Sequence, residues 1–86
     1  MLDKLLRRKD FSVSLDKTGS TFHYRERGRT LRVSGETMAQ GYAVYSSSIK
    51  QWENAPAEAI DEAERQRIAS NIRSYYVERG KAVYLS

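Results

Sequence analysis

The sequence predicts an α+β fold in which an antiparallel sheet of about four to five strands packs against one long C-terminal helix and ends in a closing strand. Two patterns support this prediction. Apolar and polar residues alternate along several segments of the first half, and an apolar stripe with helical spacing follows in the second half. The chain has 86 residues, a length that suits one domain. We therefore expect a single α+β domain over residues 11–86.

The strands are predicted by alternation. Polar residues separate Phe11, Val13 and Leu15, as in a half-buried strand. Alternation continues on both sides of Arg27-Gly28, which indicates a tight hairpin with a glycine in its turn. The expected apolar face of this hairpin consists of Phe22, Tyr24, Leu31 and Val33.

The rest of the sheet is less regular in sequence. Residues 41–45 are predicted as a further strand and residues 81–85 as the closing strand. Between them, residues 34–40 are expected to form a connector and residues 53–60 a loop that contains the single proline. Residues 1–10 are expected to be an N-terminal arm or a short helix.

The helix is predicted over about residues 62–79. The run from Asp61 to Glu64 has the spacing of a capping box, in which each side chain accepts from the backbone N–H of the other residue. Gly80 suits the left-handed position that ends a helix. The apolar stripe consists of Ile68, Ile72, Tyr75 and Tyr76.

Composition excludes several classes of protein. The chain has no cysteine, which rules out disulfides and cysteine-ligated zinc. No apolar run approaches the roughly 20 residues of a membrane-spanning helix, and the charged first residues are not followed by the apolar stretch of a secretory signal. We expect a cytoplasmic protein that does not enter a membrane.

The sequence offers no recognisable catalytic machinery. The one histidine, His23, falls on the predicted polar face of a strand without a neighbour in sequence that would orient it. Residues 46–48 are serines but lack the glycine-flanked turn of a nucleophile, and the five glycines are scattered singly. We therefore expect no enzyme, no metal and no cofactor, and a function in binding another macromolecule.

Charge suggests where such a macromolecule would bind. The formal net charge is +4, with nine Lys or Arg against four acids in residues 1–34 and six against seven in residues 35–86. A basic hairpin patch consists of Arg25, Arg27, Arg29 and Arg32, which suits phosphates or acidic proteins, or simply keeps a strand face soluble.

A second, acidic patch consists of Glu53, Glu58, Asp61 and Glu62. It suits a basic protein, although capping of the helix explains Asp61 equally well. Trp52 adjoins this patch. It is a candidate anchor for a partner or, alternatively, a lid on the core.

Three runs of the chain carry a family resemblance: residues 24–33, residues 44–52, and residues 60–68 with 71–73. The most distinctive element is the Tyr45-Ser-Ser-Ser-Ile49 run that leads to Trp52. These runs resemble small bacterial immunity proteins that are found beside polymorphic toxins, including those of contact-dependent growth inhibition. The resemblance covers about residues 20–86.

The resemblance implies a protein that binds a cognate toxin domain, such as a nuclease, and neutralises it without chemistry. Which charged patch would face the toxin stays open, as does the oligomeric state. The alternative is a small regulatory protein that binds nucleic acid through the basic hairpin patch. We do not favour that alternative because Tyr24 should point into the core, which leaves no aromatic platform for bases.

Overall fold

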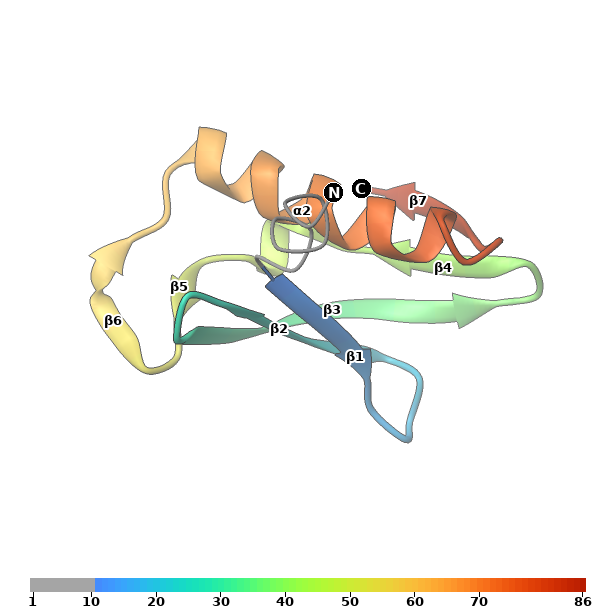
Figure 1. The fold of residues 1–86 in the computed structure, drawn as a ribbon, viewed down its shortest axis with the longest axis horizontal. Helices are drawn as coiled ribbons and strands as arrows, with labels where there is room; N and C mark the ends of the chain where they lie inside the picture. Colours follow the sequence, from blue (N-terminus) through green and yellow to red (C-terminus); the bar gives the residue numbers. More distant parts are fainter. Residues whose placement is uncertain (1–10) are drawn as a thin grey trace, which may run out of the picture.

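A five-stranded sheet is the framework of the protein, whose computed structural model describes residues 11–86. Its strands are β1 (Phe11–Leu15), β2 (Thr21–Glu26), β3 (Arg29–Met38), β4 (Gly41–Val44) and β7 (Ala82–Leu85), in the spatial order β1-β2-β3-β4-β7. Helix α2 (Glu62–Val77) lies along one side of this sheet (Figure 1). The predicted α+β fold with its C-terminal helix and closing strand is confirmed. The arm or short helix expected at residues 1–10 lies outside the described residues.

The closing strand pairs in a direction that the sequence did not indicate. β1 to β4 pair antiparallel with their neighbours, but β7 pairs parallel with β4, from Gly41 opposite Ala82 to Val44 opposite Leu85. The chain leaves the end of β4, crosses the sheet through α2 and returns in the same direction. A parallel pair requires such a long connection, so the helix and the direction of β7 are linked.

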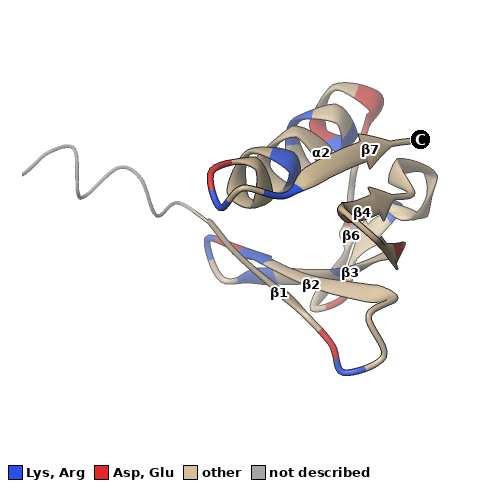
Figure 2. Ribbon diagram, turned by 90° about the vertical axis from the view of Figure 1, so that its right-hand side faces the viewer, with Lys and Arg blue, Asp and Glu red and all other residues tan. Residues whose placement is uncertain are grey.

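The hydrophobic core lies between α2 and the sheet, which form two layers (Figure 2). The predicted apolar face of the hairpin is confirmed, since Phe22, Tyr24, Leu31 and Val33 are each at most 2% exposed. The predicted stripe of the helix is confirmed at three of its four positions, which are the buried residues Ile68, Ile72 and Tyr76. Tyr75 is half-buried and packs against the edge of the core.

The expected connector at residues 34–40 is wrong, because β3 continues through this segment to Met38 and turns directly into β4. The alternation of apolar and polar residues is interrupted here because a glycine occupies an inward position of the strand. A side chain on Gly35 would collide with the ring of Phe22 and the carbonyl oxygen of Ala43. The position is part of the core side of the strand but has no room for an apolar side chain.

The expected loop at residues 53–60 is also wrong. Strands β5 (Gln51–Trp52) and β6 (Ala55–Ala59) pair antiparallel as a small hairpin. This hairpin follows the short 3₁₀ turn η1 (Ser46–Ser48). It covers the half of β3 that β4 does not reach: the N–H of Thr30 donates to Asn54 Oδ1 at 2.9 Å, and the N–H of Glu53 donates to the carbonyl of Thr30 at 2.7 Å.

Both ends of α2 are capped by residues that lie next to the helix in the sequence. Asp61 caps the start by accepting from the N–H of Glu64 at 2.8 Å, whereas the Glu64 carboxylate contacts Arg67 and Arg29 instead of returning to Asp61 as a full capping box would. At the other end, Gly80 adopts a φ of 81°. The N–H of Lys81 donates to the carbonyl of Tyr76 at 3.0 Å, which completes a Schellman motif.

Candidate functional site

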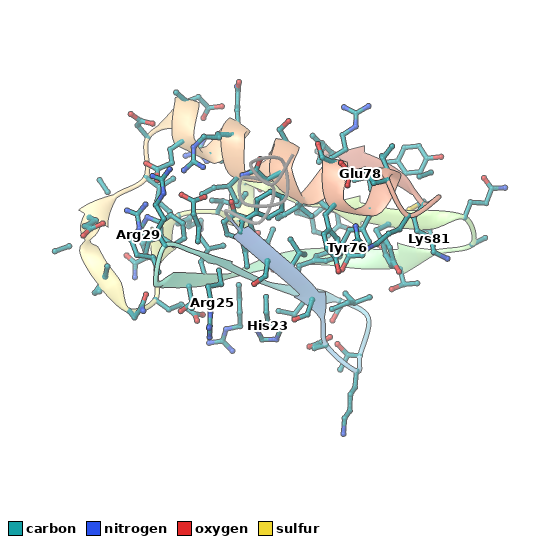
Figure 3. The ribbon with its side chains drawn as sticks, in the orientation of Figure 1. His23, Arg25, Arg29, Tyr76, Glu78 and Lys81 are labelled. Atoms are coloured by element: carbon teal, nitrogen blue, oxygen red, sulfur yellow. The ribbon has the colours of Figure 1, made fainter. Side chains whose placement is uncertain are left out.

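The basic hairpin patch is built on the turn between β2 and β3. Arg27 and Gly28 occupy this turn with φ values of 50° and 80°, the combination of a type I′ turn that matches the twist of the strands. Arg25 points away from α2, while Arg29 lies on the side of the helix (Figure 3). Arg32 lies opposite His23 in the register and therefore shares the face of Arg25. The four arginines therefore do not share one surface.

The acidic patch is engaged within the protein. Glu53 Oε2 accepts from Arg32 Nε at 2.6 Å, and Glu58 Oε1 accepts from Arg29 Nη1 at 2.6 Å. Glu62 pairs with Arg65 on the next turn of α2. The carboxylate of Asp61 is the helix cap. Each of the four carboxylates thus has a partner, and the patch carries little unbalanced negative charge.

Two residues of each candidate patch meet in one contact, which we call the neutralised contact. Arg32–Glu53 and Arg29–Glu58 join the β2–β3 hairpin to the segment that precedes α2, across 21 and 29 residues of sequence. Sequence reasoning treated the patches as alternatives because nothing in their spacing shows that the chain folds the acidic segment back onto the hairpin.

Trp52 lies beneath this contact. Its side chain is 0% exposed, and the Arg29 guanidinium lies over its ring at 4.3 Å from the centroid. The ring of Tyr24 also stacks on the ring of Trp52, with their centroids 6.3 Å apart. The structure therefore places Trp52 in the core, where it supports Arg29 from below, and its side chain does not reach the surface.

A buried polar network adjoins this contact and was not singled out from the sequence. Glu26 is 2% exposed and accepts from Tyr24 Oη at 2.6 Å and from Arg67 Nη1 at 2.7 Å and Nη2 at 3.0 Å. Asn71 Nδ2 donates to Tyr24 Oη at 2.8 Å. The available signal was alternation, because Glu26 continues the inward series of Phe22 and Tyr24.

Electrostatics within this network follow from burial and partners. Burial alone raises the pKa of Glu26, but hydrogen bonds from Arg67 and Tyr24 and the charges of Arg67 and Arg27 outweigh it, so the pKa lies below its ordinary value. Burial and the hydrogen bond to Glu26 raise the pKa of Tyr24. The network thus holds an ionised carboxylate next to a neutral phenol, and burial and hydrogen bonding account for both charge states.

The side of the sheet away from α2 carries a polar surface, which we call the open face. It consists of outward residues of β1, β2 and β3, in register as Ser12–Arg25–Thr30 and Ser14–His23–Arg32. A groove of about 350 Å³ lies on it, lined by Ser12, Ser14, His23, Arg25, Thr30 and Glu53 among others. His23 and Arg25 project from this face (Figure 3).

A second hollow of about 570 Å³ lies between the hairpin turn and the start of α2. Three arginines and two acids line it: Arg27, Arg29, Arg67, Asp61 and Glu64. Salt bridges and the helix cap already engage four of these five residues.

Across the described residues, 11–86, no three His, Cys, Asp or Glu side chains are grouped so that they could hold a metal ion. In the same residues, no helix is both long and apolar enough to span a membrane. His23 is exposed, and its cross-strand neighbours are Ser14 and Arg32.

Comparison with known proteins identifies the family. No curated protein and no solved structure matches the chain significantly. The family model described as Immunity protein 74 (Imm74) matches residues 12–86, which include every strand from β2 onward, the helix, the open face and the neutralised contact. The resemblance to immunity proteins noted in the sequence is confirmed, and this chain belongs to the Immunity protein 74 family.

Proposed function

We propose that this protein neutralises a cognate bacterial toxin domain by stoichiometric binding. The observation that supports this is the family match over residues 12–86. We further propose that residues 11–86 act as one domain, that the toxin belongs to a polymorphic system such as contact-dependent growth inhibition, and that neutralisation occurs in the cytoplasm. A nuclease is one class of toxin that this function would accommodate.

Protection by binding differs measurably from protection by an enzyme. The test uses the toxin domain encoded by the reading frame next to that of this chain, expressed in a bacterial host from an inducible promoter. We expect growth arrest with the toxin alone and normal growth when both proteins are expressed. A purified complex should form, and titration of toxin activity should reach full inhibition at an equimolar ratio.

Two results would count against this proposal. If the host is not rescued and no complex forms with the adjacent toxin domain, the protein is not its immunity partner. If full protection requires only a small fraction of one molar equivalent, the protein acts catalytically on the toxin or on its product, and the binding mechanism is wrong.

The alternative function, binding of nucleic acid by the basic hairpin patch, has less support from the geometry. Arg29 and Arg32 are engaged with carboxylates of the same chain, and Tyr24 lies in the core. Binding to phosphates gains affinity from several unpaired cations and from exposed aromatic rings.

A further inference from the structure

The distribution of unpaired charge indicates which surface meets the partner. Among residues 11–86, the carboxylates of the acidic patch are engaged in ion pairs or in the helix cap. Arg25 and Arg27, by contrast, have no carboxylate within 4.0 Å among the described residues. At the β2–β3 hairpin, the charge that is free to attract a partner is therefore positive: Arg25 lies on the open face and Arg27 at the tip.

The open face concentrates hydrogen-bond donors around this charge. Its groove is lined by the hydroxyls of Ser12, Ser14 and Thr30 and by the side chains of His23 and Arg25. The one acid at the groove, Glu53, is occupied by Arg32 at 2.6 Å. Guanidinium and hydroxyl donors without a competing free carboxylate suit an anionic group.

The hairpin tip provides a second observation. Arg27 adopts a φ of 50°, a left-handed conformation that favours glycine, asparagine or aspartate over a long side chain. Local conformation alone would favour asparagine at this position. An arginine at a strained, exposed turn is the kind of residue that functional sites hold.

We propose that the open face and Arg27 together form the interface with the toxin, and that they receive carboxylate side chains of an acidic segment of the toxin domain. This inference rests on the proposed function. A basic toxin surface would have to displace Arg29 and Arg32 from their carboxylates, whereas an acidic segment meets Arg25 and Arg27 without breaking an internal pair. Complementary charge of this kind also accelerates association.

The first experiment reverses a charge at the open face. Arg25→Glu is compared with Arg73→Glu, which makes the same change of charge on an exposed position of α2. Binding to the adjacent toxin domain is measured by calorimetry at physiological salt. We expect Arg25→Glu to weaken binding about tenfold or more and Arg73→Glu to leave it within about twofold. Circular dichroism verifies the fold of each variant, and Arg25→Gln replaces Arg25→Glu if the latter is unfolded.

The second experiment separates binding from stability at the tip. Arg27→Asn relieves the strained turn, so we expect a higher midpoint of thermal unfolding together with weaker toxin binding. A merely structural role of Arg27 would not produce opposite changes in the two quantities. In a third arm, acidic residues of the toxin are changed to arginine one at a time. The change that restores binding of Arg25→Glu identifies the carboxylate that faces Arg25.

The outcomes separate the two proposals. If the wild-type protein does not bind the toxin domain, the proposed function fails. If the wild type binds and Arg25→Glu and Arg27→Asn bind equally well, the function stands and this interface is wrong. If a short fluorescent oligonucleotide binds the wild type more tightly than the toxin does, with a steep salt dependence that Arg25→Glu abolishes, the open face is a nucleic-acid site and the inference is overturned.

Discussion

The guanidinium of Arg67 donates two hydrogen bonds to the carboxylate of Glu26, at 2.7 and 3.0 Å, and so ties α2 to the end of β2 across 41 residues of sequence. The two partners differ in exposure, because the Glu26 side chain is 2% exposed and that of Arg67 is 45% exposed. Removal of Arg67 therefore leaves a buried carboxylate without this ion pair, whereas removal of Glu26 leaves a partly exposed guanidinium without it. The two substitutions should lower the free energy of unfolding by different amounts.

The first prediction concerns this asymmetry. Arg67→Ala leaves a buried carboxylate with the Tyr24 hydroxyl and the weaker influence of Arg29 and Arg27, so we expect the free energy of unfolding to fall by about 2 kcal/mol. Glu26→Gln leaves an arginine that can turn to water, so we expect a smaller loss, about 1 kcal/mol. Urea denaturation followed by circular dichroism measures both. Arg73→Ala on the same helix is the control, and equal losses for Arg67→Ala and Glu26→Gln would contradict the asymmetry.

The second prediction concerns acid. Because the pKa of Glu26 is lower in the folded state than in the unfolded state, its ionised form stabilises the fold above the unfolded pKa, about 4.3. This stabilisation is lost as the pH falls through the folded pKa. Urea midpoints of the wild type and Glu26→Gln should therefore differ at pH 7 and converge as the pH falls below the unfolded pKa and through the lower folded pKa. A constant difference over this range would show that Glu26 does not carry the effect.

Asp16 also contributes to acid sensitivity. Its pKa is lowered chiefly by the hydrogen bond from the Thr18 hydroxyl, at 2.7 Å. Because this turn is the same in both proteins, its contribution cancels in the comparison of wild type with Glu26→Gln.

The third prediction uses Trp52, the single tryptophan of the chain. Its ring is 0% exposed and lies under Arg29, so its fluorescence should be blue-shifted and weakly quenched by acrylamide. Arg29→Ala removes the cation–π contact and the ion pair with Glu58, and we expect stronger quenching and a loss of about 1–2 kcal/mol in stability. Arg32→Ala is the control, because its exposed pair with Glu53 does not cover the ring. Unchanged quenching in Arg29→Ala would mean that Arg29 does not shield Trp52.

The fourth prediction concerns the contact between β4 and β7. A side chain on Gly41 would collide with the backbone of Ala82 in the neighbouring strand, so Gly41→Ala should destabilise the protein strongly, by about 3 kcal/mol, as other steric overpacking in a core does. Gly80→Ala is the matched control. Its position has open space within 4 Å and suffers only from its φ of 81°, so its cost should be about 1 kcal/mol. Thermal unfolding of the two variants checks the order.

The fifth prediction separates the members of the acidic patch. Asp61→Ala removes the helix cap, and we expect a loss of about 1 kcal/mol. Glu53→Ala and Glu62→Ala break exposed ion pairs, and we expect smaller losses, about 0.5 kcal/mol or less. Urea denaturation ranks the three variants. Losses of the same size at Glu53 and Asp61 would show that the patch acts as an electrostatic unit instead.

Local patterns predicted the elements whose signals lie within a few residues. Alternation placed the core face of the hairpin, and the Asp61 cap and Gly80 placed both ends of α2. The same rules failed where an inward strand position carries no apolar side chain. Gly35 is an inward strand position without a side chain, so a rule that counts apolar residues ended the strand too early.

The candidate site was only partly predictable. Its residues were named from their charges, but the sequence contains no information on which arginine meets which carboxylate, because those contacts span 21 to 41 residues. Alternation along β2 indicated that Glu26 faces the core, but its partners Arg67 and Tyr24 became evident only in the structure.

The amino-acid sequence alone predicted the α+β fold class, the positions of the hairpin and the helix, and the resemblance to immunity proteins. These depend on local periodicity, turn and cap chemistry, and the order of residues along the chain. The three-dimensional structure was needed to show that β7 runs parallel to β4 and that Trp52 is buried. It was also needed to show that Glu58 and Glu53 pair with Arg29 and Arg32. Pairing between distant segments depends on how the helix and the sheet pack around a common core. The same packing leaves Arg25 and Arg27 without a carboxylate partner among the described residues.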